Sequence, residues 1–201
     1  SSPGMNKIES QSAKTIVMVR PASFAYNTQT ASSNSFQIQD TALDEKSIAD
    51  LAISEFDQMV NTLRKKDIEV IVFEDTPFPQ KPDAVFPNNW ISTHADSTII
   101  TYPMYSPNRR PERREDIIQS LTEKYAVKQH YSFETAEEDD LFLEGTGSMI
   151  LDRENKIVYA SLSPRTDPQL LDRFALLRRY QKVQFHAKDP SGGAIYHTNV
   201  I

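Results

Sequence analysis

A strand–strand–helix–strand unit is encoded by residues 148–186, SMILDRENKIVYASLSPRTDPQLLDRFALLRRYQKVQFH. Two apolar runs flank the polar residues 153–155, a pattern typical of a β-hairpin. Asp167 followed by Pro168 predicts a helix start, because aspartate caps helix N-termini and proline fits the first helical position. The expected elements are strands over 148–151, 156–162 and 182–186, and a helix whose apolar face is Leu170, Leu171, Phe174 and Leu177.

The same order of elements occurs once before this unit. A strand over 90–93, a turn over 95–97, a strand over 98–102, a helix and a strand over 127–133 precede an acidic loop over 134–140. The expected apolar face of that helix is Ile117, Ile118, Leu121 and Tyr125. The connection after the second strand also recurs, since SPNR at 106–109 is answered by SPRT at 163–166, 57 positions later. We interpret this as a structural repeat in an α/β fold.

The two ends of the chain are less regular. Residues 15–20 predict a strand, the polar stretch up to Asp40 a long loop, the apolar spacing from Asp44 a helix, and residues 69–73 a buried strand. A third repeat is expected to open at 194–201. A strand that ends without its hairpin partner predicts a truncated domain, and a closing edge strand is the alternative. We expect residues 1–14 to be disordered or tag-derived and residues 15–201 to form one incomplete domain.

Composition narrows the class of partner. The 28 acidic and 22 basic residues give a formal charge of −6, spread along the chain, which disfavours nucleic acid and anionic membranes and leaves small solutes. No apolar run approaches the roughly 20 residues of a membrane span, so we expect a cytoplasmic protein. The sequence holds no cysteine, which excludes disulfides and thiolate metal sites within it. We expect no metal and no cofactor, and a homodimer is left open.

Three loops combine polar residues with glycine, proline or aromatic residues, at 82–90, 143–147 and 192–199. Loops on a rigid scaffold are where sites are usually built, and the repeat predicts that these three converge at one end of the molecule. Each residue also has a purely structural interpretation. Asp83 suits a turn, Asn88 and Asn89 can bond their own backbone, Glu144 can cap a loop, and His197 can be a core histidine.

Two arginines are more informative. Arg109 and Arg165 each follow the second strand of a repeat, and two converging guanidinium groups suit bidentate capture of a carboxylate. The alternative, a solvated charge at a helix start, opposes the helix macrodipole. For Arg109 both interpretations stay open, because Arg110, Arg113 and Arg114 lie beside it.

At these residues the sequence resembles the guanidino-group-modifying superfamily, the penteins, and most closely its citrulline-utilisation hydrolases and dimethylarginine dimethylaminohydrolases. The resemblance runs from about Thr15 to the last residue. The matching stretches are VRP at 19–21 with Asn27, Thr30, Ala31, Asn34, Phe36 and Gln37, PDAVFPNNW at 82–90, LEGTG at 143–147, LSPRTD at 162–167 and YHTN at 196–199. It implies a five-bladed α/β propeller of which this chain supplies about three modules and the start of a fourth, truncated at its C-terminal side.

The resemblance also implies a mechanism. A cysteine thiolate, expected beyond these residues, attacks the guanidinium or ureido carbon, ammonia leaves, and water resolves the covalent intermediate. His197 matches the family's general acid and base, and Glu144 matches the carboxylate that orients it. Arg165 and Arg109 match the clamp on the substrate carboxylate. Asp83 and Phe86 match residues that line the substrate pocket.

Departures from the family pattern bear on the substrate. Asn89 and Asn199 stand where relatives place aspartates, and Gly147 stands where relatives often have another. Amides suit the neutral ureido group of citrulline better than a guanidinium cation, which needs a counter-charge when buried. The alternatives are arginine deiminase, dimethylarginine hydrolase or amidinotransferase activity, and a non-catalytic propeller that binds without reacting.

Overall fold

The computed structural model describes residues 9–23, 37–188 and 190–193, apart from the side chains of residues 37–43. It divides into a small unit, Lys14–Phe86, and a large unit made of Ser1–Ala13 with Pro87–Ile201. Within the described ranges no helix combines the length and apolar character needed to span a membrane. The repeat expected at residues 194–201, with His197 and Asn199, lies outside the described residues.

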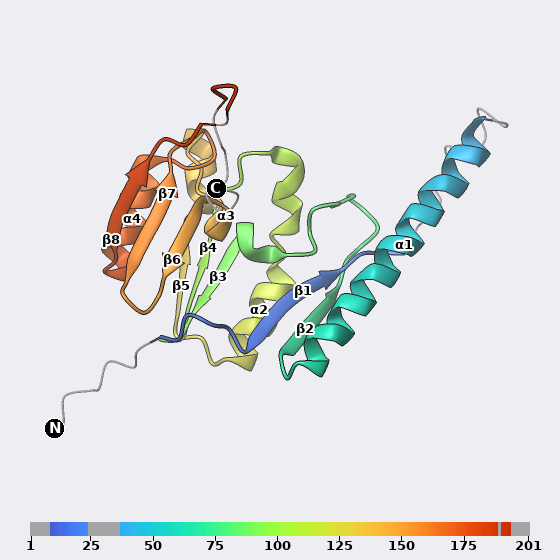
Figure 1. Cartoon of the computed structure of the whole chain (residues 1–201), viewed down its shortest axis with the longest axis horizontal. Helices are drawn as coiled ribbons and strands as arrows, with labels where there is room; N and C mark the ends of the chain where they lie inside the picture. Colours follow the sequence, from blue (N-terminus) through green and yellow to red (C-terminus); the bar gives the residue numbers. More distant parts are fainter. Residues whose placement is uncertain (1–8, 24–36, 189, 194–201) are drawn as a thin grey trace. The chain divides into compact units, whose positions relative to one another are not determined.

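The small unit is a parallel strand pair covered by one long helix (Figure 1). Strands β1 (Thr15–Arg20) and β2 (Glu69–Glu74) pair in parallel, and α1 (Gln37–Lys65) connects them. Its core is formed by Met18, Phe56, Val60 and Val70. Both strands are confirmed, but the polar loop does not extend to Asp40, since α1 already begins at Gln37. The expected helix therefore starts earlier than its apolar spacing shows.

The first module of the large unit has the predicted order. Strand β3 (Ile91–His94) pairs antiparallel with β4 (Thr98–Thr101), and β5 (Gln129–Ser132) pairs in parallel with β4 after helix α2 (Glu115–Lys124). Three 3₁₀ helices accompany it: η1 (Pro87–Asn89), η2 (Pro107–Glu112) and η3 (Glu134–Asp139), the last replacing the expected acidic loop.

The second module repeats this topology. Helix α3 (Gly145–Ser148) leads into the antiparallel pair β6 (Met149–Asp152) and β7 (Ile157–Ser161), and α4 (Pro168–Arg178) returns the chain to β8 (Gln181–Phe185) beside β7. Asp167 caps α4 as predicted, because its Oδ2 accepts the backbone N–H groups of Gln169 and Leu170. The repeat is therefore confirmed as a mixed α/β fold with the sheet orders β3-β4-β5 and β6-β7-β8.

One hydrophobic core serves both modules. It joins side chains of the two sheets with those of α4, and its fully buried members include Ile100, Tyr102, Phe133, Leu143, Met149, Val158, Leu171 and Phe174. Burying a side chain of this size stabilises a fold by about 1.5–3 kcal/mol. Tyr125 was expected on the buried face of α2 but is 42% exposed. Its backbone has left the helix, at φ −104° and ψ 7°, so the ring no longer follows the helical stripe.

The amino-terminal residues of the large unit contact the turn of the second hairpin. Gln11 donates from Nε2 to the carbonyl of Leu151 at 2.9 Å and accepts the N–H of Arg153 at 2.8 Å. Glu9 forms an ion pair with Arg153. Of the stretch 1–14 that was expected to be disordered or tag-derived, these described residues have specific partners.

A buried polar chain lies inside the first hairpin. The hydroxyl of Ser92 lies 2.9 Å from His94 Nε2 and 2.6 Å from the hydroxyl of Tyr102. Burial, and then the positive charges of Arg178 and Arg153, lower the pKa of His94 from 6.5 to about 3. His94 is therefore neutral at pH 7, where it can accept or donate within this chain.

We expect the protein to lose stability in mild acid because of His94. The unfolded state takes up a proton near pH 6.5 and the folded state only near pH 3, so stability is full above pH 6.5 and falls as the pH drops. Urea unfolding should show a loss of about 2 kcal/mol between pH 7.5 and pH 5. His94→Gln should remove most of that loss, whereas His130→Gln should keep it, because His94 is retained. Equal acid sensitivity of the His94→Gln variant and the wild type would contradict this assignment.

Candidate functional site

The carboxylate of Glu144 is the centre of the candidate site. Glu144 precedes the single turn of α3, and the backbone N–H groups of Gly147 and Ser148 donate to its carbonyl at 2.9 and 3.1 Å. The hydroxyl of Ser148 accepts the N–H of Glu144 at 2.8 Å. This reciprocal bonding fixes the backbone, and the Glu144 side chain is completely buried.

The buried carboxylate has partners in both modules. The backbone N–H of Tyr105 donates to Oε2 at 3.2 Å, and a guanidinium nitrogen of Arg165 lies 3.4 Å from Oε1. A buried charge requires such partners, because desolvation without them costs several kcal/mol. Tyr105 follows the second strand of the first module, and Arg165 follows the second strand of the second module. The repeat thus brings one residue from each connection to the same carboxylate.

Arg165 is held by its backbone as well as by its charge. Its carbonyl accepts a hydrogen bond from the Ser148 hydroxyl at 2.8 Å, and its N–H donates to the Ser163 hydroxyl at 3.1 Å. Its side chain remains 25% exposed. A guanidinium that is fixed on one side and accessible on the other can bind a carboxylate through two parallel hydrogen bonds.

The asparagines at 88 and 89 lie directly against the Glu144 turn. Asn88 Nδ2 donates to Asn89 Oδ1 at 3.1 Å, and Asn89 is buried. A Cβ on Gly147 would lie 2.6 Å from Asn89 Oδ1, and one on Gly145 would lie 2.2 Å from the carbonyl oxygen of Asn88. Gly145 also has a φ of +47°, which side-chain-bearing residues rarely adopt. Both glycines therefore permit a close approach between η1 and the 143–147 loop within the large unit.

Arg109 has a different environment from Arg165. It lies in η2 and donates two parallel hydrogen bonds to Glu112. One runs from Nε to Oε2 at 2.9 Å and the other from Nη2 to Oε1 at 3.1 Å. Glu112 is buried. The repeat offset of 57 also places Asn108, and not Arg109, opposite Arg165. The two arginines therefore do not occupy equivalent positions.

The remaining predicted residues are not placed relative to Glu144. Asp83 and Phe86 belong to the small unit, where both are exposed. His197 and Asn199 lie outside the described residues. Their assignment to the site stays a prediction.

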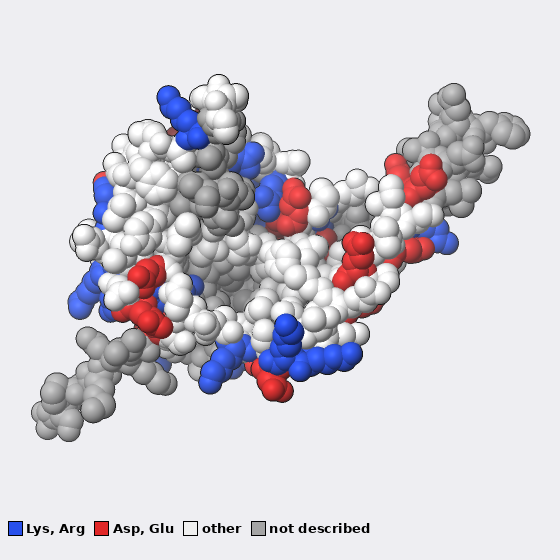
Figure 2. All heavy atoms as spheres, in the orientation of Figure 1, with Lys and Arg blue, Asp and Glu red and all other residues white. Residues whose placement is uncertain are grey.

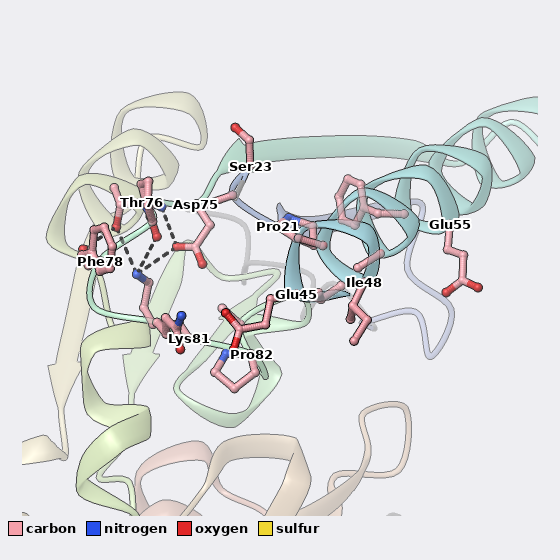
Figure 3. Close-up of a pocket in the computed structure, with 18 of the residues that line it drawn as sticks. Pro21, Ser23, Glu45, Ile48, Glu55, Asp75, Thr76, Phe78, Lys81 and Pro82 are labelled. Carbon is pink, nitrogen blue, oxygen red and sulfur yellow. Dashed lines mark hydrogen bonds and ion pairs between the residues drawn. The ribbon is translucent and has the colours of Figure 1, made fainter. Parts of the chain in front are cut away.

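A cavity of about 680 Å³ lies within the small unit, between α1 and the loop that follows β2 (Figure 3). Its walls are mostly apolar and include Ile48, Phe56, Met59 and Phe78. The ammonium of Lys81 lies beside it, buried against Asp75 at 3.2 Å and donating to Thr76 and to the carbonyl of Pro79. Neither Asp83 nor Phe86 lines this cavity. The carboxylates of Glu45 and Glu55 also line it. We keep the candidate site around Glu144, because that is where the LEGTG and LSPRTD stretches meet.

Sequence reasoning did not identify Tyr105 and Phe142. Their rings pack edge-to-face with centroids 5.3 Å apart, and the Arg165 guanidinium lies 5.2 Å from the centroid of Tyr105. Their positions in the sequence could have indicated them. Tyr105 directly precedes the repeated SPNR connection, and Phe142 directly precedes the LEGTG loop.

Charge and metal-ligand chemistry add two findings. On the face drawn in Figure 2, basic side chains are interspersed with acidic ones and form no continuous basic area. Among the residues that the structure describes, no three histidine, aspartate or glutamate side chains are grouped to hold a metal ion.

Comparison with solved structures identifies the same fold in three structures of two enzymes. The cyanobacterial arginine dihydrolase ArgZ matches 90% of this chain at 17% identity and a TM-score of 0.58, and the match covers 23% of its own chain. Its N-terminal domain with bound substrate gives 18% identity, a TM-score of 0.59, and coverages of 90% and 60%. The adduct of a dimethylarginine dimethylaminohydrolase with S-methyl-L-thiocitrulline is 14% identical, with a TM-score of 0.59. The match covers 90% of this chain and 64% of that protein. The chain thus spans 23% to 64% of these proteins.

No curated protein matches the chain in sequence. A family model does match, over residues 20–201, and its description is "N,N dimethylarginine dimethylhydrolase, eukaryotic". The match extends over nearly the whole chain and confirms the resemblance that the loop motifs indicated. The chain therefore belongs to this family, within the guanidino-group-modifying penteins.

Proposed function

We propose that this chain is part of a hydrolase that cleaves a C–N bond in the ureido or guanidino group of a free amino acid, with citrulline as the favoured substrate. The observation that carries the proposal is the fully buried carboxylate of Glu144, which contacts a partly exposed arginine and belongs to a turn that packs against Asn88 and Asn89. The family match and the names of the similar structures, an arginine dihydrolase and a dimethylarginine hydrolase, support the same reaction class.

In the proposed reaction the substrate's α-carboxylate binds Arg165, whose guanidinium is partly exposed. A cysteine thiolate from beyond these 201 residues, which contain none, adds to the ureido carbon. His197 protonates the terminal ureido nitrogen, which leaves as ammonia. His197 then removes a proton from the water molecule that displaces the thiolate. The resulting carbamate gives ornithine and carbon dioxide, so one water is consumed for each ammonia released. Glu144 orients His197 in both steps.

The preference for citrulline rests on the charge of the pocket. Asn89 supplies an amide where a carboxylate would pair with a guanidinium, and Asn199 is proposed to do the same after the histidine. A neutral ureido group both donates and accepts hydrogen bonds, as an amide does, whereas a buried cation would lack its counter-charge. Asp83 and Phe86 complete the proposed pocket. The description of the family favours dimethylarginine, a guanidino compound, as the second candidate.

The finer architecture is also proposed. Two equal modules and the β1–α1–β2 unit would be three blades of a five-bladed propeller. The equal topology of the two modules and the partial coverage of the similar structures support this arrangement.

The substrate is tested by the release of ammonia from citrulline and arginine and of dimethylamine from asymmetric dimethylarginine, using the full-length protein and a variant with its candidate cysteine replaced by alanine. We expect cysteine-dependent release that is fastest from citrulline. Faster turnover of either guanidino compound would refute the amide argument while keeping the reaction class. No release from any of the three would favour the non-catalytic binding module.

The role of Glu144 is tested with Glu144→Gln, which keeps the shape and removes the charge. In the proposed mechanism the Glu144 carboxylate raises the basicity of His197. Its loss should therefore lower kcat by roughly a hundredfold with a small change in KM. The control is Glu137→Gln, which removes a carboxylate that pairs with Arg110 and Arg113 in the same unit. If kcat were equally low in both variants, the loss would reflect general damage to the fold.

The two arginines are expected to differ. Arg165→Gln should raise KM by roughly tenfold to a hundredfold, because it removes charge-assisted hydrogen bonds to the substrate carboxylate, and it should also lower stability, because the buried Glu144 loses its ion-pair partner. Arg109→Gln should leave KM near the wild-type value and lower the free energy of unfolding by about 3 kcal/mol, because buried Glu112 loses its partner. Steady-state kinetics and urea unfolding of both variants give these quantities. An equal rise in KM in both, with stability unchanged, would show that Arg109 shares the clamp.

A further inference from the structure

A large aromatic side chain is exposed next to the buried carboxylate. Tyr105 is 43% exposed, although its ring packs edge-to-face against the buried ring of Phe142. The guanidinium of Arg165 lies 5.2 Å from the centroid of the Tyr105 ring, and that of Arg110 lies 5.7 Å from the centroid of Phe142. Each of the two rings therefore has a guanidinium group close to it.

Tyr105 contacts the two central residues of the site through different atoms. Its backbone N–H donates to Glu144 Oε2 at 3.2 Å, and its ring supports Arg165. A guanidinium over an aromatic face is attracted by the ring and loses freedom to rotate away. Because the Arg165 side chain retains 25% exposure, the ring restrains it without covering it completely.

We propose that the side chain of Tyr105 is a substrate-positioning group. Its ring holds Arg165 in the orientation that receives an α-carboxylate, and its exposed surface packs against the methylene chain of a linear amino acid. Amino acids with an unbranched alkyl chain are thus the substrate class that the ring selects. The inference rests on the proposed function, and it assigns the binding of the amino-acid end of the substrate to a residue that does no chemistry.

This division of labour gives a kinetic signature. Side-chain substitutions leave the backbone N–H bond to Glu144 intact, so the chemical step should be preserved. Tyr105→Leu should raise KM for citrulline roughly tenfold and keep kcat within about twofold. Tyr105→Phe keeps the ring and should restore KM to near the wild-type value. The matched control is Tyr125→Leu, because Tyr125, just after the end of α2, is 42% exposed and has the Lys124 ammonium 5.8 Å from its ring centroid.

Calorimetric titration with ornithine gives a second readout that requires no turnover. Ornithine keeps the carboxylate and the methylene chain, so its Kd should rise about as much as KM in Tyr105→Leu and stay unchanged in Tyr125→Leu. Equal ornithine affinity in wild type and Tyr105→Leu overturns the inference, as does a Tyr105→Phe variant as weak as Tyr105→Leu. An inactive wild type that binds ornithine through Tyr105 would refute the proposed hydrolase and keep this inference. An inactive wild type that does not bind ornithine would refute both.

Discussion

The burial of one charge organises the large unit. A carboxylate without access to water must obtain its hydrogen bonds from the protein, and Glu144 obtains them from the connections after β4 and β7. Those connections come from different modules, so the two modules must be correctly placed against each other for the buried carboxylate to have its partners. The shared hydrophobic core provides that register, and Leu143, next to Glu144, is one of its buried members.

Ser148 converts this electrostatic requirement into a fixed geometry. One hydroxyl accepts the N–H of Glu144 and donates to the carbonyl of Arg165, both at 2.8 Å. The carboxylate and the guanidinium are thus linked twice, through their charges and through a buried side chain between their backbones. A site built in this way is preorganised, since neither group needs to be ordered when a substrate binds.

The sequence was sufficient to predict the helices and strands of the two modules, but not the side-chain contacts between them. Hairpin turns, the Asp167 cap and helical spacing are local signals, and the elements that they predicted are present. Glu144 and Arg165 were identified through the family motifs, and the structure brings them together. Both interpretations of Arg109 were left open by the sequence, and the structure adds its ion pair with the buried Glu112, a contact that motif and spacing do not reveal. Tyr105 was missed because its importance depends on a ring contact with a residue of the next module.

The packing of η1 against α3 leaves no room for a side chain at position 147. A side chain at position 147 would begin 2.6 Å from Asn89 Oδ1, inside the contact distance that atoms tolerate. An aspartate at position 147 would also place a negative charge next to the amide oxygen of Asn89, which already accepts a hydrogen bond from Asn88. The packing therefore accounts for glycine at position 147 in this chain, where the Asn89 amide lies against it. The amide and the glycine form one contact, which holds η1 against the turn that carries Glu144.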